Sequence, residues 1–379
     1  MEASLRHQKV WSGLYPLVKP FVRHRFALES EPCEVDGPCI VIPNHVTDWD
    51  PFLVAMSFRN KPLYFVASEH IFRLKLASRA IEWALSPIAR KKGDSGFGAA
   101  REILRRTKQG HSICLFAEGD CTWSGITSPV LPATGKLVRS SGATLVTYRL
   151  EGGYFTRPRW GRNVRKGWMR GHAVGVYPPE TLRRMKGPEI TALINRDLSE
   201  NAWARLEREP VFYRGKAPAE RLESTLYLCP DCRRIGTLKS RGGAFKCGCC
   251  GFTVIARTDG SFHPAVPFEN VAAWDAWQAE ALRAGDYEHG SVLFSDEVLS
   301  FRRLLEEHQS EKLLPGRMVQ RADRLCCGSM SFPLEDIDFM AMVQKRTLLF
   351  TVGSEHYEIK CRKGSNLRKY LAVWQNAKE

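Results

Sequence analysis

The chain has 379 residues, which is long for one hydrophobic core and suits two or three domains. Its hydrophobic fraction of 44% and aromatic fraction of 10% are those of a folded protein, which excludes a largely disordered chain. The net charge of +15 lies mostly in residues 51–200, where 25 Lys and Arg against 11 Asp and Glu leave an excess of 14. This balance favours a polyanionic partner, either nucleic acid or an anionic lipid surface.

No segment is apolar enough to span a bilayer, because a spanning helix needs about 20 mostly apolar residues. The longest stretch without Asp, Glu, Lys or Arg, Cys121 to Gly135, contains two prolines and two glycines. Lys19 and two prolines interrupt the apolar residues near the N-terminus, so no signal peptide is expected. We therefore expect a cytoplasmic protein, peripheral at the inner face of the membrane.

The N-terminal segment has apolar residues at three- and four-residue steps: Val10, Trp11, Leu14, Val18 and Phe21. With the neighbouring Lys and Arg, this pattern is typical of a helix that packs on its domain or lies on a membrane surface. Pro16 and Pro20 argue against one continuous helix.

Apolar strands and amphipathic helices alternate from residue 38. The expected strands are 38–43, 63–67, 112–117, 144–148 and 173–177, and the expected helices are 51–59, 96–109 and 188–208. This alternation predicts an α/β domain around a buried sheet. The charged stretch 207–223 reads as a linker.

The first motif that carries chemistry is Asn44-His45-Val46-Thr47-Asp48-Trp49-Asp50, directly after the strand 39–43. A histidine accepts a proton near neutral pH, and a carboxylate on its far nitrogen fixes the tautomer and stabilises the imidazolium. His45 and Asp50 can thus deprotonate an alcohol. Alternatively, Asp50 caps the helix that begins at Pro51.

Two further features follow. The segment Phe116-Ala117-Glu118-Gly119-Asp120 closes a strand, so Glu118 could bind acceptor hydroxyls while Gly119 permits close backbone approach. The basic cluster Ala89-Arg90-Lys91-Lys92-Gly93 suits a phosphate, or is a solvated basic surface.

Taken in order, residues 10–200 resemble the glycerolipid acyltransferase superfamily, which includes the 1-acylglycerol-3-phosphate acyltransferases. The resemblance rests on four ordered blocks: His45-x4-Asp50, the arginine of the second block at Arg90, Phe116-x-Glu118-Gly119, and Gly135-Lys136 before an apolar strand. It implies His45 and Asp50 as catalytic residues, and Asn44, Arg90, Glu118, Gly119 and Lys136 as substrate-binding residues.

The resemblance also implies a mechanism. His45 takes the proton from an acceptor hydroxyl, which attacks the thioester of acyl-CoA or acyl-carrier protein in phospholipid synthesis. We expect direct transfer, because no Ser or Cys occupies a nucleophile-elbow pattern such as GxSxG.

The third block departs from the family pattern. Members commonly read Phe-Pro-Glu-Gly-Thr-Arg-Ser, whereas this chain has Ala117, Asp120 and Cys121 at the Pro, Thr and Arg positions. In the family, that arginine normally helps to bind the acceptor phosphate. Its replacement by Cys121 leaves the identity of the acceptor open. Replacement cations are expected from the arginine-rich segment 157–166, which is otherwise a solvated loop.

Four cysteines then follow at metal-ligand spacing. Cys229-x2-Cys232, fourteen residues and Cys247-x2-Cys250 match a tetrahedral zinc ribbon, in which structural zinc supplies much of the folding free energy. Cys249 is a spare thiol. The ribbon suits a protein partner. Nucleic acid is disfavoured, because the basic excess lies in 51–200 rather than beside the ribbon.

The remaining chain reads as a helix over 271–283, short strands from residue 291 and a last helix near 367–374, in a pattern that resembles pleckstrin-homology-like modules. We thus predict an α/β acyltransferase-like domain at 1–215, a zinc ribbon at 222–258 and a β-rich domain at 266–379. The competing hypothesis is a non-catalytic lipid-binding scaffold whose zinc ribbon binds a partner.

Overall fold

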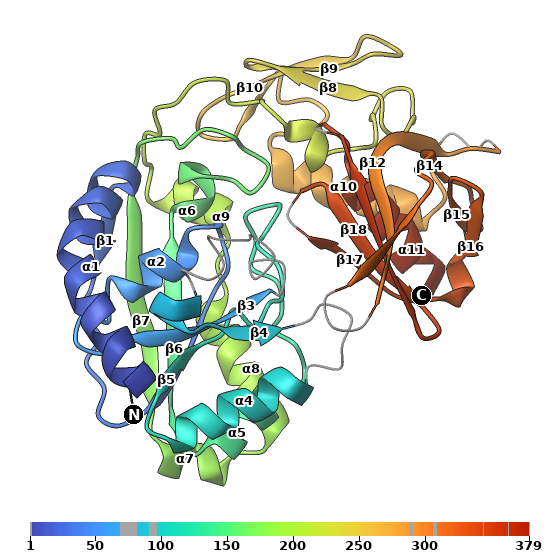
Figure 1. Cartoon of the computed structure of the whole chain (residues 1–379). Coiled ribbons are helices and arrows are strands. Elements are labelled where there is room, and N and C mark those ends of the chain that lie inside the picture. The colour runs from blue at the N-terminus through green and yellow to red at the C-terminus, as the bar shows by residue number, and fades with distance from the viewer. Residues whose placement is uncertain are drawn as a thin grey trace. The chain divides into compact units, whose positions relative to one another are not determined.

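The computed structural model describes residues 2–68, 82–90, 97–287, 291–305, 309–343, 345–362 and 364–378 (Figure 1). The chain divides into two units, one comprising Met1–Arg159 with Asn163–Gly215 and the other Trp160–Arg162 with Lys216–Glu379. The three-part division expected from the sequence stays a prediction.

The first unit is built on a seven-stranded sheet with the order β1-β7-β6-β2-β5-β3-β4, in which only the β6–β7 pair is antiparallel. Its strands are β1 (Leu28–Ser30), β2 (Cys39–Pro43), β3 (Leu63–Ser68), β4 (Ile88–Arg90), β5 (Ser112–Cys114), β6 (Thr144–Glu151) and β7 (Met169–Tyr177). β2 is buried along its whole length, which explains its continuous apolar sequence. The α/β class predicted from the alternating pattern is confirmed.

Helices cover both faces of this sheet. Ile40 and Ile42 of β2 belong to the core beneath α4 (Phe97–Lys108), α5 (Thr134–Ser141), α7 (Pro179–Arg184) and α8 (Gly187–Leu198). Cys39 and Val41 belong to the other core, with α1 (Glu2–Phe26) and α2 (Asp50–Ala55). Successive β2 side chains thus enter opposite cores, as the two-residue period of a strand requires.

The helix expected over 188–208 is two helices. α8 ends at Leu198, and α9 (Ala202–Arg208) begins after Asn201, whose side chain accepts hydrogen bonds from the amides of Trp203 and Ala204. Asparagine is a favoured N-cap, so it starts a new helix within an apolar pattern that reads as continuous. The short helix α6 (Gly153–Thr156) follows β6.

α1 is continuous through Pro16 and Pro20, so the prediction that these prolines interrupt the helix was wrong. Ser12, Pro16 and Pro20 are all exposed, so the carbonyls of Ser12 and Pro16, which lose their helix donors to the prolines, lie on the solvent side of the helix. The opposite face is held by burial and by bonds from Trp11 Nε1 to Phe58 O (3.3 Å) and Tyr15 Oη to Met56 O (3.1 Å). Within the described residues, no helix is long and apolar enough to cross a membrane.

The second unit begins with the 3₁₀ turn η2 (Leu222–Ser224) and a four-stranded antiparallel sheet of order β11-β10-β9-β8. Its strands are β8 (Leu238–Arg241), β9 (Ala244–Cys247), β10 (Thr253–Ala256) and β11 (Phe262–His263). Helix α10 (Val271–Arg283) follows, with bounds equal to those predicted. Trp274 on α10 is fully buried and contacts Phe245 and Phe262, which gives this small sheet its core.

An eight-stranded antiparallel sheet completes the second unit, in the order β16-β15-β14-β12-β19-β18-β17 with β13 also paired to β12. The strands are β12 (Phe294–Leu304), β13 (Ser310–Leu313), β14 (Arg317–Gln320), β15 (Arg324–Cys327), β16 (Met330–Pro333), β17 (Ile337–Val343), β18 (Thr347–Val352) and β19 (Glu355–Cys361), with the 3₁₀ turn η3 (Leu334–Asp336) between β16 and β17. The terminal helix α11 (Arg368–Lys378) is tied to β17 by Trp374 Nε1, which donates to Ile337 O at 2.9 Å. The β-rich character predicted for this region is confirmed.

Candidate active site

The candidate site forms where β2 ends. β2 lies between β5 and β6, with both neighbours parallel to it, so the segments that follow the three strands meet at one edge of the sheet. Asn44 closes this edge, because its Nδ2 donates to Leu150 O (3.0 Å) and its Oδ1 accepts from Leu150 N (2.7 Å). Asn44 is buried, with 2% exposed, and its two bonds to Leu150 join the end of β2 to the end of β6.

The carboxylate of Asp50 organises the loop that carries His45. It accepts hydrogen bonds from His45 Nδ1 (2.8 Å), Val46 N (2.6 Å), Thr47 N (2.9 Å) and Thr47 Oγ1 (2.8 Å). Asp50 is 0% exposed and is the first residue of α2, whose N-cap is Trp49. Asp50 therefore binds the loop before the helix and does not cap α2, so the capping alternative was wrong.

The imidazole of His45 is fixed on several sides. Its Nδ1 is engaged by Asp50, one face stacks on Phe116 with the ring centroids 4.4 Å apart, and the side chain is 19% exposed. Burial by itself lowers the pKa of His45, but Cys121 and the hydrogen-bonded Asp50 outweigh it and raise that pKa well above the usual value. With Nδ1 occupied, Nε2 is the nitrogen that can exchange a proton with a substrate.

Glu118 fixes the backbone of the same histidine. Its Oε1 accepts from His45 N (2.6 Å) and its Oε2 from Ser128 N (2.8 Å), and burial raises the pKa of Glu118 to about 7. Gly119 has φ +81°, in the left-handed region that favours glycine, so it forms the turn after Glu118. Both carboxylate oxygens are thus bonded to backbone amides.

The other predicted substrate-binding residues lie elsewhere on the first unit. Arg90 is the last residue of β4 and is partly buried, and burial lowers its pKa. Lys91, Lys92 and Gly93, the rest of that basic cluster, lie outside the described residues. Lys136 is exposed on α5, beside Gly135, whose backbone approaches Gly187 of α8 so closely that any Cβ would meet its carbonyl at 2.0 Å. This close approach of α5 to α8 explains why position 135 is glycine.

Two further residues lie at the site, of which sequence reasoning gave Cys121 no role. Cys121 Sγ lies 3.3 Å from His45 Nε2 and 3.4 Å from Nδ1. Arg159 forms an ion pair with Asp120 and lies over the Trp123 ring, 4.5 Å from its centroid. The spacing of the third block could have indicated Cys121. Arg159 belongs to the arginine-rich segment 157–166, from which replacement cations were expected, and it pairs with Asp120 of the third block.

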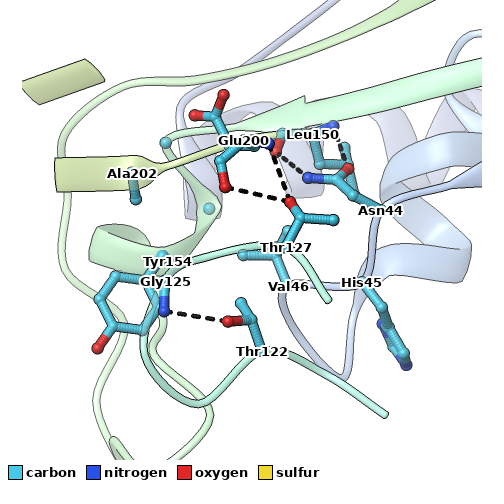
Figure 2. Close-up of a pocket in the computed structure, with 12 residues that line it drawn as sticks. Asn44, His45, Val46, Thr122, Gly125, Thr127, Leu150, Tyr154, Glu200 and Ala202 are labelled. Carbon is cyan, nitrogen blue, oxygen red and sulfur yellow. Dashed lines mark hydrogen bonds between the residues drawn. The ribbon is translucent and has the colours of Figure 1, made fainter. Parts of the chain in front are cut away.

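A small cavity of about 10 Å³ adjoins the site, enough for about one water molecule. It is lined by the segments after β2, β5 and β6, including Asn44, Thr122 and Thr127, and by Glu200 between α8 and α9. In Figure 2 the ring of His45 points away from Thr122 and Thr127, so this cavity lies behind the loop that carries His45. The exposed part of the His45 ring faces away from the cavity.

A buried ion network supports the wall of this cavity. Arg205 on α9 bonds Glu200 (2.6 Å) and Glu151 (2.7 Å), and the side chains of all three are at most 12% exposed. Glu200 also accepts, through its backbone carbonyl, from the amide of Thr127 at 3.0 Å. Removing one partner would leave a buried charge unpaired, which is costly. Because Thr127 is bonded to Glu200, the network also holds the loop around Thr127 in place.

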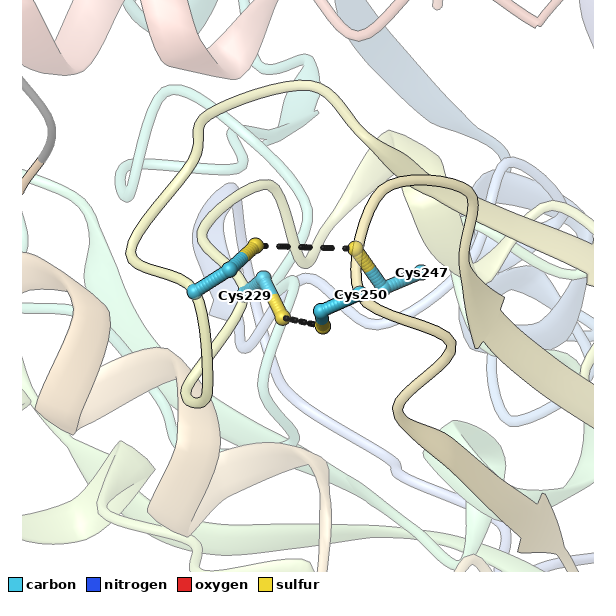
Figure 3. A group of neighbouring side chains, drawn as sticks. Cys229, Cys247 and Cys250 are labelled. Carbon is cyan, nitrogen blue, oxygen red and sulfur yellow. Dashed lines mark hydrogen bonds between the residues drawn. The ribbon is translucent and has the colours of Figure 1, made fainter.

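The second unit holds the four predicted cysteine thiols together. Cys229, Cys232, Cys247 and Cys250 place their sulfurs within 4.8 Å of one another, and the pairs 229–250 and 232–247 are each 3.7 Å apart (Figure 3). A tetrahedral site with Zn–S bonds of about 2.3 Å has sulfur–sulfur edges of about 3.8 Å. The amide of Cys249 donates to Cys247 Sγ at 3.3 Å, a contact that stabilises a thiolate. The donor set thus fits zinc.

Part of the first unit is similar to known proteins. Residues 25–151 match the family model described as Acyltransferase, a range that contains His45, Asp50 and Glu118. Among solved structures, the chain is similar to the 1-acyl-sn-glycerophosphate (LPA) acyltransferase PlsC from Thermotoga maritima, with 18% sequence identity, coverage of 49% of this chain and 78% of that chain, and a TM-score of 0.36. The resemblance to acyltransferases predicted from the ordered blocks is confirmed by the family model over residues 25–151.

Proposed function

We propose that this domain transfers a fatty acyl group from acyl-CoA or acyl-carrier protein to the hydroxyl of a lysolipid, 1-acylglycerol-3-phosphate or a related acceptor, in phospholipid synthesis. The observation that carries the proposal is the His45–Asp50 pair, with Nδ1 and the carboxylate 2.8 Å apart, inside the residues that match the acyltransferase family. A histidine oriented in this way is a general base for a hydroxyl nucleophile.

In this mechanism His45 Nε2 accepts the proton of the acceptor hydroxyl as its oxygen attacks the acyl carbonyl. Asp50 holds the ring in the tautomer with hydrogen on Nδ1 and stabilises the imidazolium that forms. Collapse of the tetrahedral intermediate breaks the carbon–sulfur bond, and the leaving thiolate takes the proton from His45. Asn44 and Glu118 act as positioning residues, because their polar atoms bond the backbone of the site.

For the acceptor headgroup we propose a contact with Arg159. Its guanidinium lies beside the third block, hydrogen-bonded to the backbone of Cys121 at 3.5 Å, and is paired with Asp120, whose side chain is 41% exposed. Because this pair carries no net charge, we expect Asp120→Asn to lower the KM for phosphate-monoester acceptors more than for neutral ones. An equal change for both acceptor classes would contradict the headgroup role.

We further propose that α1 docks on an anionic membrane surface. Leu14, Leu17 and Phe21 lie on one face at helical spacing and are 40%, 69% and 49% exposed. Exposed basic residues surround them: Lys9, Lys19, Arg23 and Arg25. An apolar stripe with flanking cations suits the interface of an anionic bilayer, where the lysolipid acceptor resides.

The four-cysteine cluster is proposed to bind structural zinc. Cys229 and Cys247 are buried, whereas Cys250 is exposed, so one side of the cluster faces solvent and can meet a protein partner. Zinc bound to four thiolates would stabilise this short unit by about 10 kcal/mol or more.

The function is tested with purified full-length protein and labelled palmitoyl-CoA or palmitoyl-acyl-carrier protein, against lysophosphatidic acid and a panel of neutral and phosphorylated lysolipids. We expect transfer to one acceptor class that is lost in His45→Ala and kept in His263→Ala, which changes an exposed histidine of the second unit. No transfer from either donor, with lipid binding unchanged in His45→Ala, would instead support the non-catalytic scaffold.

A further inference from the structure

The small sheet beside the four-cysteine cluster has one buried face and one open face. The register of β8, β9 and β10 places successive side chains on alternate sides of this sheet (Figure 1). The inward side chains Leu238, Phe245 and Val254 are buried. The outward ones are exposed or half-buried and are here named the ribbon face: Lys239, Arg241, Ala244, Lys246, Thr253 and Ile255.

The ribbon face carries three cations and no carboxylate. Lys239, Arg241 and Lys246 are exposed, and none of them forms an ion pair with another described residue. Lys239 and Lys246 stand directly opposite each other in the antiparallel β8–β9 pair. Like charges in that position destabilise a sheet, so the stability of the fold does not account for them. An anion bound across the two strands would relieve the repulsion.

The packing beneath the sheet fixes these cations on its solvent side. Phe245 of β9 contacts the buried Trp274 of α10, with ring centroids 5.5 Å apart. Cys247, the last residue of β9, belongs to the four-cysteine cluster. A one-residue slip of any strand would bury its polar side chains and expose its apolar ones. The ribbon face is therefore a fixed platform of positive charge.

The composition of the ribbon face distinguishes between kinds of polyanion. Aromatic side chains dominate protein–protein hot spots and the stacking of single-stranded bases, and the ribbon face has none. Lysine is depleted at protein interfaces. An anionic bilayer requires neither a pocket nor a stacking ring, because each Lys or Arg near its surface strengthens binding by about fivefold. Ile255 is 45% exposed beside these cations, an apolar contact that suits the headgroup layer.

We propose that the ribbon face binds the surface of an anionic bilayer, with Lys239, Arg241 and Lys246 on lipid phosphates and Ile255 in the headgroup layer. This contact is separate from α1, which belongs to the first unit, whereas the ribbon face belongs to the second. It goes beyond the proposed acyl transfer and does not depend on it. The four-cysteine segment then has a lipid-binding role in addition to its structural one.

The test measures lipid binding without acyl donor or acceptor. Full-length protein is co-sedimented with phosphatidylcholine vesicles that contain about 30% phosphatidylglycerol, and with phosphatidylcholine vesicles alone. We expect the double variant Lys239→Glu/Lys246→Glu to lower the affinity for the anionic vesicles by about 20-fold or more and to leave binding to the neutral vesicles unchanged. The matched control Lys312→Glu/Lys360→Glu reverses two exposed lysines of the eight-stranded sheet and should keep the affinity.

A single variant separates binding from folding. Lys246→Glu places a carboxylate opposite Lys239, so the thermal unfolding temperature should stay equal or rise. Its affinity for anionic vesicles should nevertheless fall by about fivefold or more. This variant decides the question if the double variant unfolds at a lower temperature than the wild type.

Salt separates the ribbon face from α1. At about 1 M salt, where charges are screened beyond about 3 Å, the wild type and the double variant should bind anionic vesicles equally. The defect of Leu17→Asp should persist there, because Leu17 contributes an apolar contact. A difference between the wild type and the double variant that survives high salt would contradict binding through charge.

The remaining results are distinct. Affinity lost in the Lys239/Lys246 variants and kept in the control supports the ribbon face. Unchanged affinity, or an equal loss in the control, overturns it, because net charge would then account for the binding. Polyglutamate and a single-stranded oligonucleotide are measured in parallel. If either binds the wild type but not the double variant, while vesicle binding is kept, the face belongs to a protein or nucleic-acid partner and the bilayer is excluded. Acyl transfer is assayed separately through His45, so none of these results decides the proposed function.

Discussion

Replacement of Asp50 tests whether the site acts through an oriented histidine. Asp50→Asn keeps the size of the side chain but removes the charge that holds His45 Nδ1 at 2.8 Å and stabilises its protonated form. General-base catalysis and its orienting carboxylate contribute about 10² to 10⁴ in rate. We therefore expect kcat to fall by about 10²-fold or more, with little change in the KM of either substrate, because Asp50 is buried beneath the loop.

Asp50→Ala adds a cost in stability that can be worked from the same contacts. Three protein donors besides His45 lose their acceptor: the amides of Val46 and Thr47 and the hydroxyl of Thr47. At about 1 kcal/mol for each unsatisfied donor, we expect the free energy of unfolding to fall by about 3 kcal/mol. For a unit of this size that corresponds to a Tm lower by about 6–12 °C.

The assay measures acyl transfer at saturating donor and acceptor, beside thermal unfolding. Asp48 is the matched control, because it lies two residues earlier with a side chain 58% exposed and a distant contact to Arg157 at 3.9 Å. We expect Asp48→Asn to keep kcat and Tm. The reasoning is refuted if Asp50→Asn retains more than about a tenth of the wild-type kcat, or if Asp48→Asn loses as much.

Three further outcomes are expected. Activity should rise with pH through a midpoint above 6.5, because only unprotonated His45 accepts a proton and the pKa of His45 is raised. Cys121→Ser should lower that midpoint, because Cys121 helps to raise the pKa of His45. A wild-type midpoint at or below 6.5 in the pH profile of kcat/KM would contradict this prediction. A chelator should release one zinc ion per chain, measured with a metal-sensitive dye, and should unfold the segment around the four-cysteine cluster. Cys249→Ser should keep the zinc. A metal-free protein with unchanged structure would argue against a structural role for zinc. Leu17→Asp should lower the affinity for anionic vesicles, measured by co-sedimentation, by about 10-fold or more. The control Leu305→Asp changes an exposed leucine of the second unit and should leave this affinity unchanged. Equal losses in both variants would exclude docking through α1.

Features of this protein that depend on neighbouring residues could be predicted from the sequence. The five-residue spacing of His45 and Asp50 is enough to predict their contact, because both lie on one short loop and the start of one helix. The cysteine pairs behave in the same way, since two tight turns set most of the geometry of a four-thiolate site. The alternation of buried strands and amphipathic helices likewise indicated the α/β class.

Contacts between distant segments were decided by the order of strands in the sheet. β2 lies between β5 and β6, so Glu118 reaches the amide of His45 across 73 positions and Asn44 reaches Leu150 across 106. The same order places the sulfur of Cys121 on the ring of His45, 76 positions away. Sequence spacing carries no signal for such pairs, because one residue type at a strand end can meet any segment that the sheet brings beside it. The histidine, its carboxylate and the arginine-rich segment that contains Arg159 could therefore be predicted from the sequence. The contact of the Cys121 thiol with the ring and the choice of Arg159 within that segment were decided by the tertiary structure.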